Sequence, residues 1–118
     1  MTLTNMRRIL RELRLQVPTD LPVRVRRIPL RVAKANSGGI TEHGYCYRRI
    51  GHYMIHINNN DHAKVQEETL LHEYAHALAY PLQADGAKMS HNHKWGNCYS
   101  RVTRVYENKF LVEPRLEE

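Results

Sequence analysis

Residues 70–78 have the sequence LLHEYAHAL, in which the pattern His-Glu-x-x-His lies inside an apolar run. On an α-helix, His72 and His76 are four residues apart and project from the same face on consecutive turns. Two neutral imidazoles placed in this way are good ligands for Zn²⁺. Glu73 lies one step round the helix, where its carboxylate can take a proton from a water beside the metal. The stretch therefore predicts the active-site helix of a zinc metallopeptidase.

The flanking residues support a buried helix, because leucine and alanine favour helix and occupy its remaining faces. The alternative is an ordinary core helix with two incidental histidines. Such a helix would bury three polar side chains without compensation, which is costly. The metal-binding interpretation is therefore preferred.

Length and composition indicate one soluble domain spanning residues 1–118, with 42% hydrophobic and 25% charged residues. No apolar run approaches the length of a membrane span, and the N-terminal region has no signal-peptide pattern. We therefore expect a cytoplasmic protein (in the host cytoplasm if phage-encoded) with no membrane partner. The two cysteines, Cys46 and Cys98, are too few and too far apart for a disulfide framework or a cysteine-based zinc ribbon.

Charge is distributed unevenly along the chain, whose net charge is +6. Residues 1–50 contain eleven Lys and Arg against three acidic residues, whereas residues 51–118 contain seven against nine. A basic half, residues 1–50, thus precedes a catalytic half, residues 51–112, and a tail, residues 113–118. The asymmetry favours attraction to a polyanion such as nucleic acid; the alternative is a solvated arginine face that serves solubility.

Three stretches that precede the metal helix have the composition of strands, at residues 23–32, 40–49 and 53–57. The first is expected to bend at Pro29, and Asn36-Ser37-Gly38-Gly39 is a turn signal after it. Because short turns connect the stretches, we expect a three-stranded antiparallel sheet.

Helices are expected on either side of this sheet in the sequence, at residues 4–16, about 64–80, and from 91–93 to about 109. A loop at residues 82–90 separates the last two. The predicted fold class is α+β and zincin-like: an N-terminal helix, the antiparallel sheet, the His-Glu-x-x-His helix and a C-terminal helix.

Arginines and tyrosines cluster on the first two predicted strands. They could follow a nucleic-acid backbone and stack exposed bases, and single-stranded DNA is the favoured partner. The candidate contacts are Arg24, Arg26, Arg48, Arg49, Tyr45 and Tyr47.

A catalytic zinc site needs a third protein ligand and one open position. The metzincin spacing places Leu82 there, which cannot bind a metal, and Glu107 is the candidate in a thermolysin-like pattern, at a rather long separation. Two histidines, His91 and His93, precede the last helix and remain as candidates. The residues alone do not choose between them.

The order His72-Glu73-x-x-His76, short loop, His91-x-x-x-Trp95 resembles the SprT-like family, in a minimal form of its Spartan-type protease domain. Members carry His-Glu-x-x-His followed by His-Gly-x-x-Phe/Trp, whose first histidine is the third zinc ligand. The resemblance, which covers about residues 50–108, implies that His72, His76 and His91 bind Zn²⁺, that Glu73 is catalytic and that Trp95 is a packing aromatic. The chain departs from the pattern at Asn92, where the family usually has Gly.

Members of the Spartan type are DNA-dependent metalloproteases that degrade proteins crosslinked to DNA, so the resemblance implies a zinc endopeptidase with a protein substrate and a DNA partner. Small phage- or bacterial-encoded members often consist of the catalytic domain alone. Two alternatives remain: a nucleic-acid-binding module with a structural zinc and no proteolysis, and a regulator-cleaving metalloprotease of the ImmA/IrrE type. The basic half and the His91/Trp95 element favour the DNA-linked function over the latter.

Overall fold

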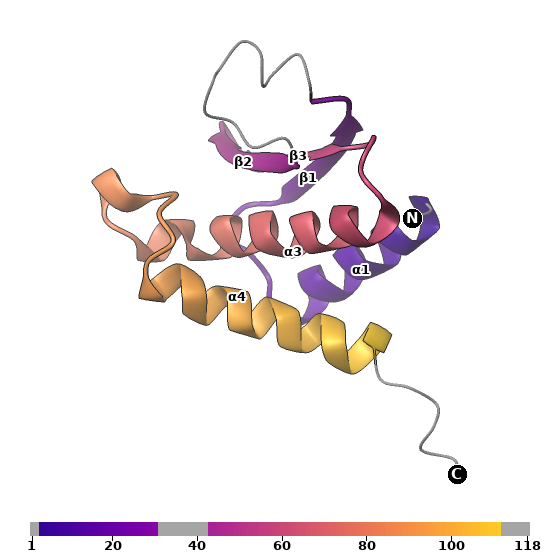
Figure 1. The fold of residues 1–118 in the computed structure, drawn as a ribbon. Coiled ribbons are helices and arrows are strands. Elements are labelled where there is room, and N and C mark those ends of the chain that lie inside the picture. The colour runs from indigo at the N-terminus through magenta and orange to yellow at the C-terminus, as the bar shows by residue number, and fades with distance from the viewer. Residues whose placement is uncertain (1–2, 31–42, 112–118) are drawn as a thin grey trace.

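A computed structural model describes residues 3–30 and 43–111 (Figure 1). Its main elements follow the expected order of helix, three strands and two helices, so the predicted α+β arrangement is confirmed. They are α1 (Leu3–Gln16), β1 (Val23–Ile28), β2 (Gly44–Arg49), β3 (His52–Asn58), α3 (Ala63–Ala79) and α4 (His93–Tyr106). Short helical turns occur at Tyr80–Leu82, Asp85–Ala87 and Glu107–Leu111. The expected turn at 36–39, the start of the second strand and the tail at 113–118 lie outside the described residues.

The sheet is mixed, with strand order β1-β3-β2. β2 and β3 are antiparallel, as predicted, but β1 runs parallel to β3, with Val23 opposite Tyr53. Burial explains why β3 lies in the centre: its residues Tyr53, Ile55 and Ile57 are fully buried, whereas β1 and β2 carry arginines, which suit sheet edges. The connection through residues 29–43 links the two edge strands.

Helix α3 is the centre of the molecule. It lies against one face of the sheet, and α4 packs along its other side (Figure 1). Its second half is buried on nearly every side, so that Leu70, Tyr74, Ala75 and Ala77 have no exposed surface. The hydroxyl of Tyr74 donates a hydrogen bond of 2.8 Å to the carbonyl of Val17, which ties α3 to the end of α1.

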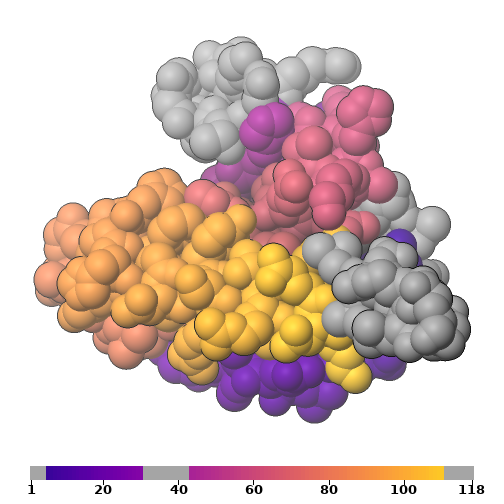
Figure 2. Space-filling model, turned by 60° about the horizontal axis from the view of Figure 1, so that its bottom comes forward, coloured from indigo at the N-terminus to yellow at the C-terminus, as the bar shows by residue number. Residues whose placement is uncertain are grey.

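Helix α1 completes the helical layer by packing against α4, and the two helices share one surface in Figure 2. The core that joins them includes Ile9 and Leu13 from α1 and Val102 and Val105 from α4. Among the described residues, no helix is long and apolar enough to cross a bilayer.

Close packing of β2 depends on Gly44. A Cβ at this position would lie 2.5 Å from the carbonyl oxygen of His56 and 2.6 Å from Cγ2 of Thr69. Gly44 therefore lets the first residue of β2 approach β3 and α3 together.

We predict that Gly44→Ala lowers the free energy of unfolding by about 1–3 kcal/mol, because the backbone of β2 must move away from its neighbours. Urea denaturation of both variants measures the effect. Gly86→Ala is the matched control, since nothing lies within 4 Å of a Cβ at that position. Equal stability of the two variants would contradict the packing argument.

Candidate active site

Three histidines converge at one end of the helical layer. His72 and His76 lie one turn apart on α3, and His91 approaches them from the segment that precedes α4. The Nε2 atom of His91 lies 3.0 Å from that of His72 and 3.1 Å from that of His76. His91, and not His93, is therefore the histidine that this fold brings to the pair on α3.

The donor set fits a zinc ion. Two nitrogens on a tetrahedral zinc with bonds of 2.0–2.1 Å are separated by roughly 3.3 Å, close to the distances between these Nε2 atoms. Burial, followed by the neighbouring His72 and His91, lowers the pKa of His76 to about 3. Burial and His91 also lower the pKa of His72. At neutral pH these two rings are uncharged, and their lone pairs are available to a metal.

Glu73 lies beside this cluster with a side chain that is only 10% exposed. Its Oε2 atom is 3.9 Å from Nε2 of His72. Burial raises the pKa of the carboxyl group to about 7. Near neutral pH both the charged and the protonated form are populated, so Glu73 can accept a proton and return it.

Trp95 on α4 packs against all three histidines. Its ring centroid lies 4.9 Å from that of His72, 5.5 Å from that of His76 and 4.6 Å from that of His91. Tyr99, one turn further along, stacks on Trp95 at 4.9 Å with an interplanar angle of 10°. The aromatic pair restricts the orientations of the imidazole rings, in agreement with the packing role expected of Trp95.

Asn92 and Gln83 hold the segment that carries His91. The side-chain oxygen of Asn92 accepts from the backbone N–H groups of Lys94 and Trp95 and so caps α4. Gln83 is 4% exposed, and its Nε2 donates to that same oxygen at 2.9 Å and to the carbonyl of Ser90 at 3.2 Å. His91 therefore sits between two residues that Gln83 fixes.

Sequence reasoning missed Gln83. A single glutamine in a loop carries no periodicity and no motif, so only the folded chain shows its partners. Asn92 did carry a signal, since asparagine before a helix is a preferred cap. Its capping role gives a physical reason for asparagine at the position where the SprT-like pattern has Gly.

A hollow of about 350 Å³ opens next to the histidines. It is lined by His43, Val65, Glu68, Thr69, His72, Glu73 and Tyr99. Tyr99 thus reaches the same space as Glu73. Tyr53 does not line this hollow: it is fully buried in the core, and its hydroxyl donates a hydrogen bond of 2.6 Å to Asp20.

The predicted nucleic-acid contacts divide between the two faces of the sheet. The face against α3 carries Tyr53, Ile55 and Ile57, and strand register places Arg48 opposite Tyr53 on that face. There its guanidinium lies 5.7 Å from the ring centroid of Tyr80. The other five share the opposite face: Arg24, Arg26, Tyr45, Tyr47 and Arg49. We call this set the basic sheet face.

We predict that Gln83→Leu weakens zinc binding by roughly tenfold or more, because His91 loses its fixed position while all three imidazoles remain. Competition with a chromophoric chelator measures the affinity. Gln16→Leu is the matched control, since Gln16 on α1 is exposed and bonds only to Glu12 among the described residues. Unchanged affinity in Gln83→Leu would show that Gln83 does not position His91.

Comparison with known proteins agrees with this geometry. Residues 20–94, which include His72, Glu73, His76 and His91, match Peptidase_M78, the IrrE N-terminal-like domain. No curated protein and no solved structure matches the chain. The match supports the metallopeptidase class that the SprT-like resemblance implied, but it points to a different family within that class. The chain belongs to the IrrE N-terminal-like family of zinc metallopeptidases.

Proposed function

We propose that this protein is a zinc-dependent endopeptidase that cleaves a regulatory protein. The observation that carries the proposal is the convergence of three Nε2 atoms beside the buried carboxyl of Glu73. The family match favours the ImmA/IrrE type, which cleaves a repressor, over degradation of proteins crosslinked to DNA.

In the proposed mechanism His72, His76 and His91 hold Zn²⁺. When bound there, the ion would supply Lewis acidity toward a carbonyl oxygen and a water. Glu73 takes a proton from the attacking water and passes it to the leaving amine. Burial raises the pKa of this carboxyl group, and a bound cation would lower it again and favour the carboxylate that accepts the proton.

The hollow beside Glu73 is the proposed place of the scissile peptide. Tyr99 lines it and is the available phenol for donating a hydrogen bond to a developing oxyanion. Tyr53 is unsuited to that role because its hydroxyl is already bonded to Asp20 in the core.

A structural zinc without proteolysis is the competing function. Structural zinc sites are closed by four protein ligands, whereas the metal-ligand group found in the described part of the chain has three histidines. The open hollow beside them also favours a catalytic site.

We predict that the wild type and His93→Ala bind one zinc per chain, whereas His91→Ala binds it much more weakly. Glu73→Gln should retain zinc and lose roughly 10²–10⁴-fold in hydrolysis, the usual contribution of a positioned acid–base group. Metal analysis and cleavage of a degenerate fluorogenic peptide library, together with self-cleavage, measure both properties. Equal hydrolysis by wild type and Glu73→Gln, or none by either, would support the structural-zinc function instead.

A second candidate function, guidance by nucleic acid, is supported by the basic sheet face. The rings of Tyr45 and Tyr47 stack at 5.8 Å, and the guanidinium of Arg49 lies 5.9 Å from the Tyr47 centroid. Arg24 and Arg26 lie across β3 from these tyrosines. Arginines beside half-buried aromatic rings suit the backbone and bases of single-stranded DNA.

We predict that Arg26→Ala and Tyr47→Ala each weaken binding of a single-stranded oligonucleotide by roughly tenfold, and that affinity falls as salt rises. Arg48→Ala, which removes the same charge from the other face, is the matched control. Fluorescence anisotropy measures binding. Equal losses in all three variants, or affinity that is independent of salt, would exclude the basic sheet face as the binding surface. A rate of hydrolysis that rises when the oligonucleotide is added would favour the DNA-linked function. A rate that does not change would favour the regulator-cleaving type.

A further inference from the structure

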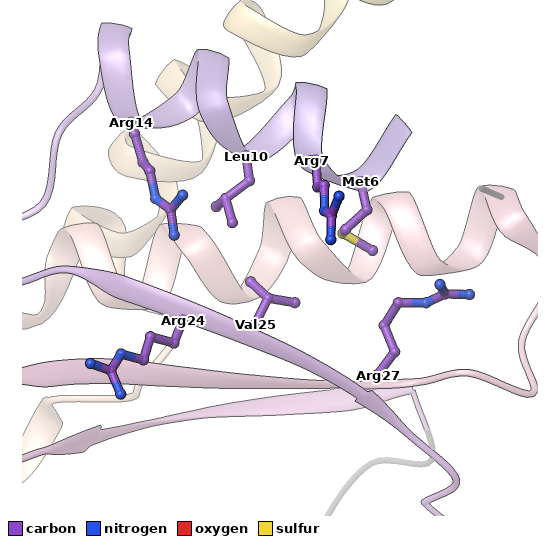
Figure 3. A pocket seen from close by; sticks show the side chains of 7 residues that line it. All are labelled: Met6, Arg7, Leu10, Arg14, Arg24, Val25 and Arg27. Atoms are coloured by element: carbon purple, nitrogen blue, oxygen red, sulfur yellow. The ribbon is translucent and has the colours of Figure 1, made fainter. Parts of the chain in front are cut away.

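A second hollow lies away from the histidines, between α1 and β1 (Figure 3). It measures about 460 Å³, and none of its lining residues belongs to the histidine cluster or to the hollow beside Glu73. We call it the arginine groove. Its lining residues are Met6, Arg7, Leu10, Arg14, Arg24, Val25 and Arg27.

The groove combines an apolar floor with a positive rim. Met6 and Leu10 descend from α1 and Val25 rises toward them from β1 (Figure 3). Arg7 and Arg14 extend from the helix toward the strand, whereas Arg27 extends from β1 at one end of the groove and Arg24 extends from β1 away from α1. A ligand must therefore offer both apolar and anionic groups.

The positive charge of the groove is uncompensated by the part of the chain that the structure describes. None of the four arginines forms an ion pair with a described residue. Arg14 donates to the carbonyl of Val23, and Arg27 donates to Oε1 of Gln66 at 2.9 Å. Arg7 and Arg24 have neither kind of bond to the described residues, so both guanidinium groups are available to a ligand.

The groove also borders an open sheet edge. β1 has β3 on one side and no described strand on the other. The carbonyls of Pro22 and Ile28 accept hydrogen bonds from the N–H groups of Tyr53 and Asn59. The backbone N–H and C=O groups of the even-numbered residues of β1 therefore point to β3, and those of the odd-numbered residues point to the open edge. Val23 faces outward and is bonded to Arg14, which leaves the backbone of Val25 and Arg27 to face the open edge.

We propose that the arginine groove docks an extended acidic and apolar segment of the protein substrate. The segment adds a strand beside Val25 and Arg27, directs a carboxylate to Arg7, and places apolar side chains on Leu10. Nucleic acid fits less well, because no aromatic side chain lines the groove for stacking. The docking role rests on the proposed peptidase function, but binding of the segment can be measured without it.

Because the groove and the histidine cluster share no residue, docking contributes to substrate affinity and not to bond cleavage. Loss of Arg7 should therefore raise KM for a substrate that carries the acidic segment and leave kcat unchanged. A substrate without the segment should be unaffected.

The test uses the full chain with the Glu73→Gln substitution, so that no peptide is cleaved. A fluorescein-labelled peptide of alternating Glu and Leu is titrated and followed by anisotropy, with a Lys and Leu peptide of equal length as the control ligand. We expect the acidic peptide to bind, and Arg7→Glu to weaken its binding about tenfold or more. Arg101→Glu on α4 carries the same charge change at an exposed site outside the groove and should have little effect.

Three results would overturn the proposal: no binding of the acidic peptide, equal binding of the basic peptide, or an equal loss in Arg101→Glu. The groove would be assigned to nucleic acid instead if two results were found together. A single-stranded oligonucleotide would have to displace the acidic peptide, and Arg7→Glu would have to abolish binding of that oligonucleotide. Thermal unfolding of each variant checks that the fold is retained. A negative result in this binding test does not change the outcome of the hydrolysis assay that compares wild type with Glu73→Gln. The docking proposal and the proposed peptidase function can therefore be rejected independently.

Discussion

The approach of His91 to the two histidines of α3 is the contact on which the rest of the structure depends. The Nε2 atom of His91 lies 3.0 Å from that of His72 and 3.1 Å from that of His76, and protonated rings this close repel one another, so the site requires uncharged rings. Burial provides this for His76, whose pKa falls to about 3. The fold must therefore bury part of a polar cluster while leaving an open side for substrate.

Helix α3 meets this requirement because it is enclosed by the sheet on one side and α4 on the other. The same burial raises the pKa of Glu73 to about 7, so one physical effect prepares both the metal ligands and the base. The third ligand comes from a loop, and a loop needs additional bonds to be precise. Gln83, Asn92 and Trp95 supply them by fixing the residues on either side of His91 and the ring itself.

Spacing alone was sufficient to place His72, Glu73 and His76 on one helix, because helical periodicity determines which side chains share a face. Only Asn92 separates His91 from His93, and only the folded loop shows which of the two histidines reaches α3. Strand order was not predictable, since the alternation of polar and apolar residues identifies a strand but not its neighbours. β3 lies in the centre of the sheet because its apolar residues are the most buried. Arg48 and Arg49 were grouped in the sequence, yet adjacent residues of a strand point to opposite faces, and the structure separates them.

Zinc K-edge X-ray absorption of the zinc-loaded chain tests the central claim most directly. Three imidazole nitrogens and one oxygen at about 2.0–2.1 Å are expected. Cys46 is not part of the three-histidine group, and burial, followed by the charge of Glu73, raises the pKa of its thiol. Sulfur scattering at about 2.3 Å, or fewer than three imidazoles, would contradict the account.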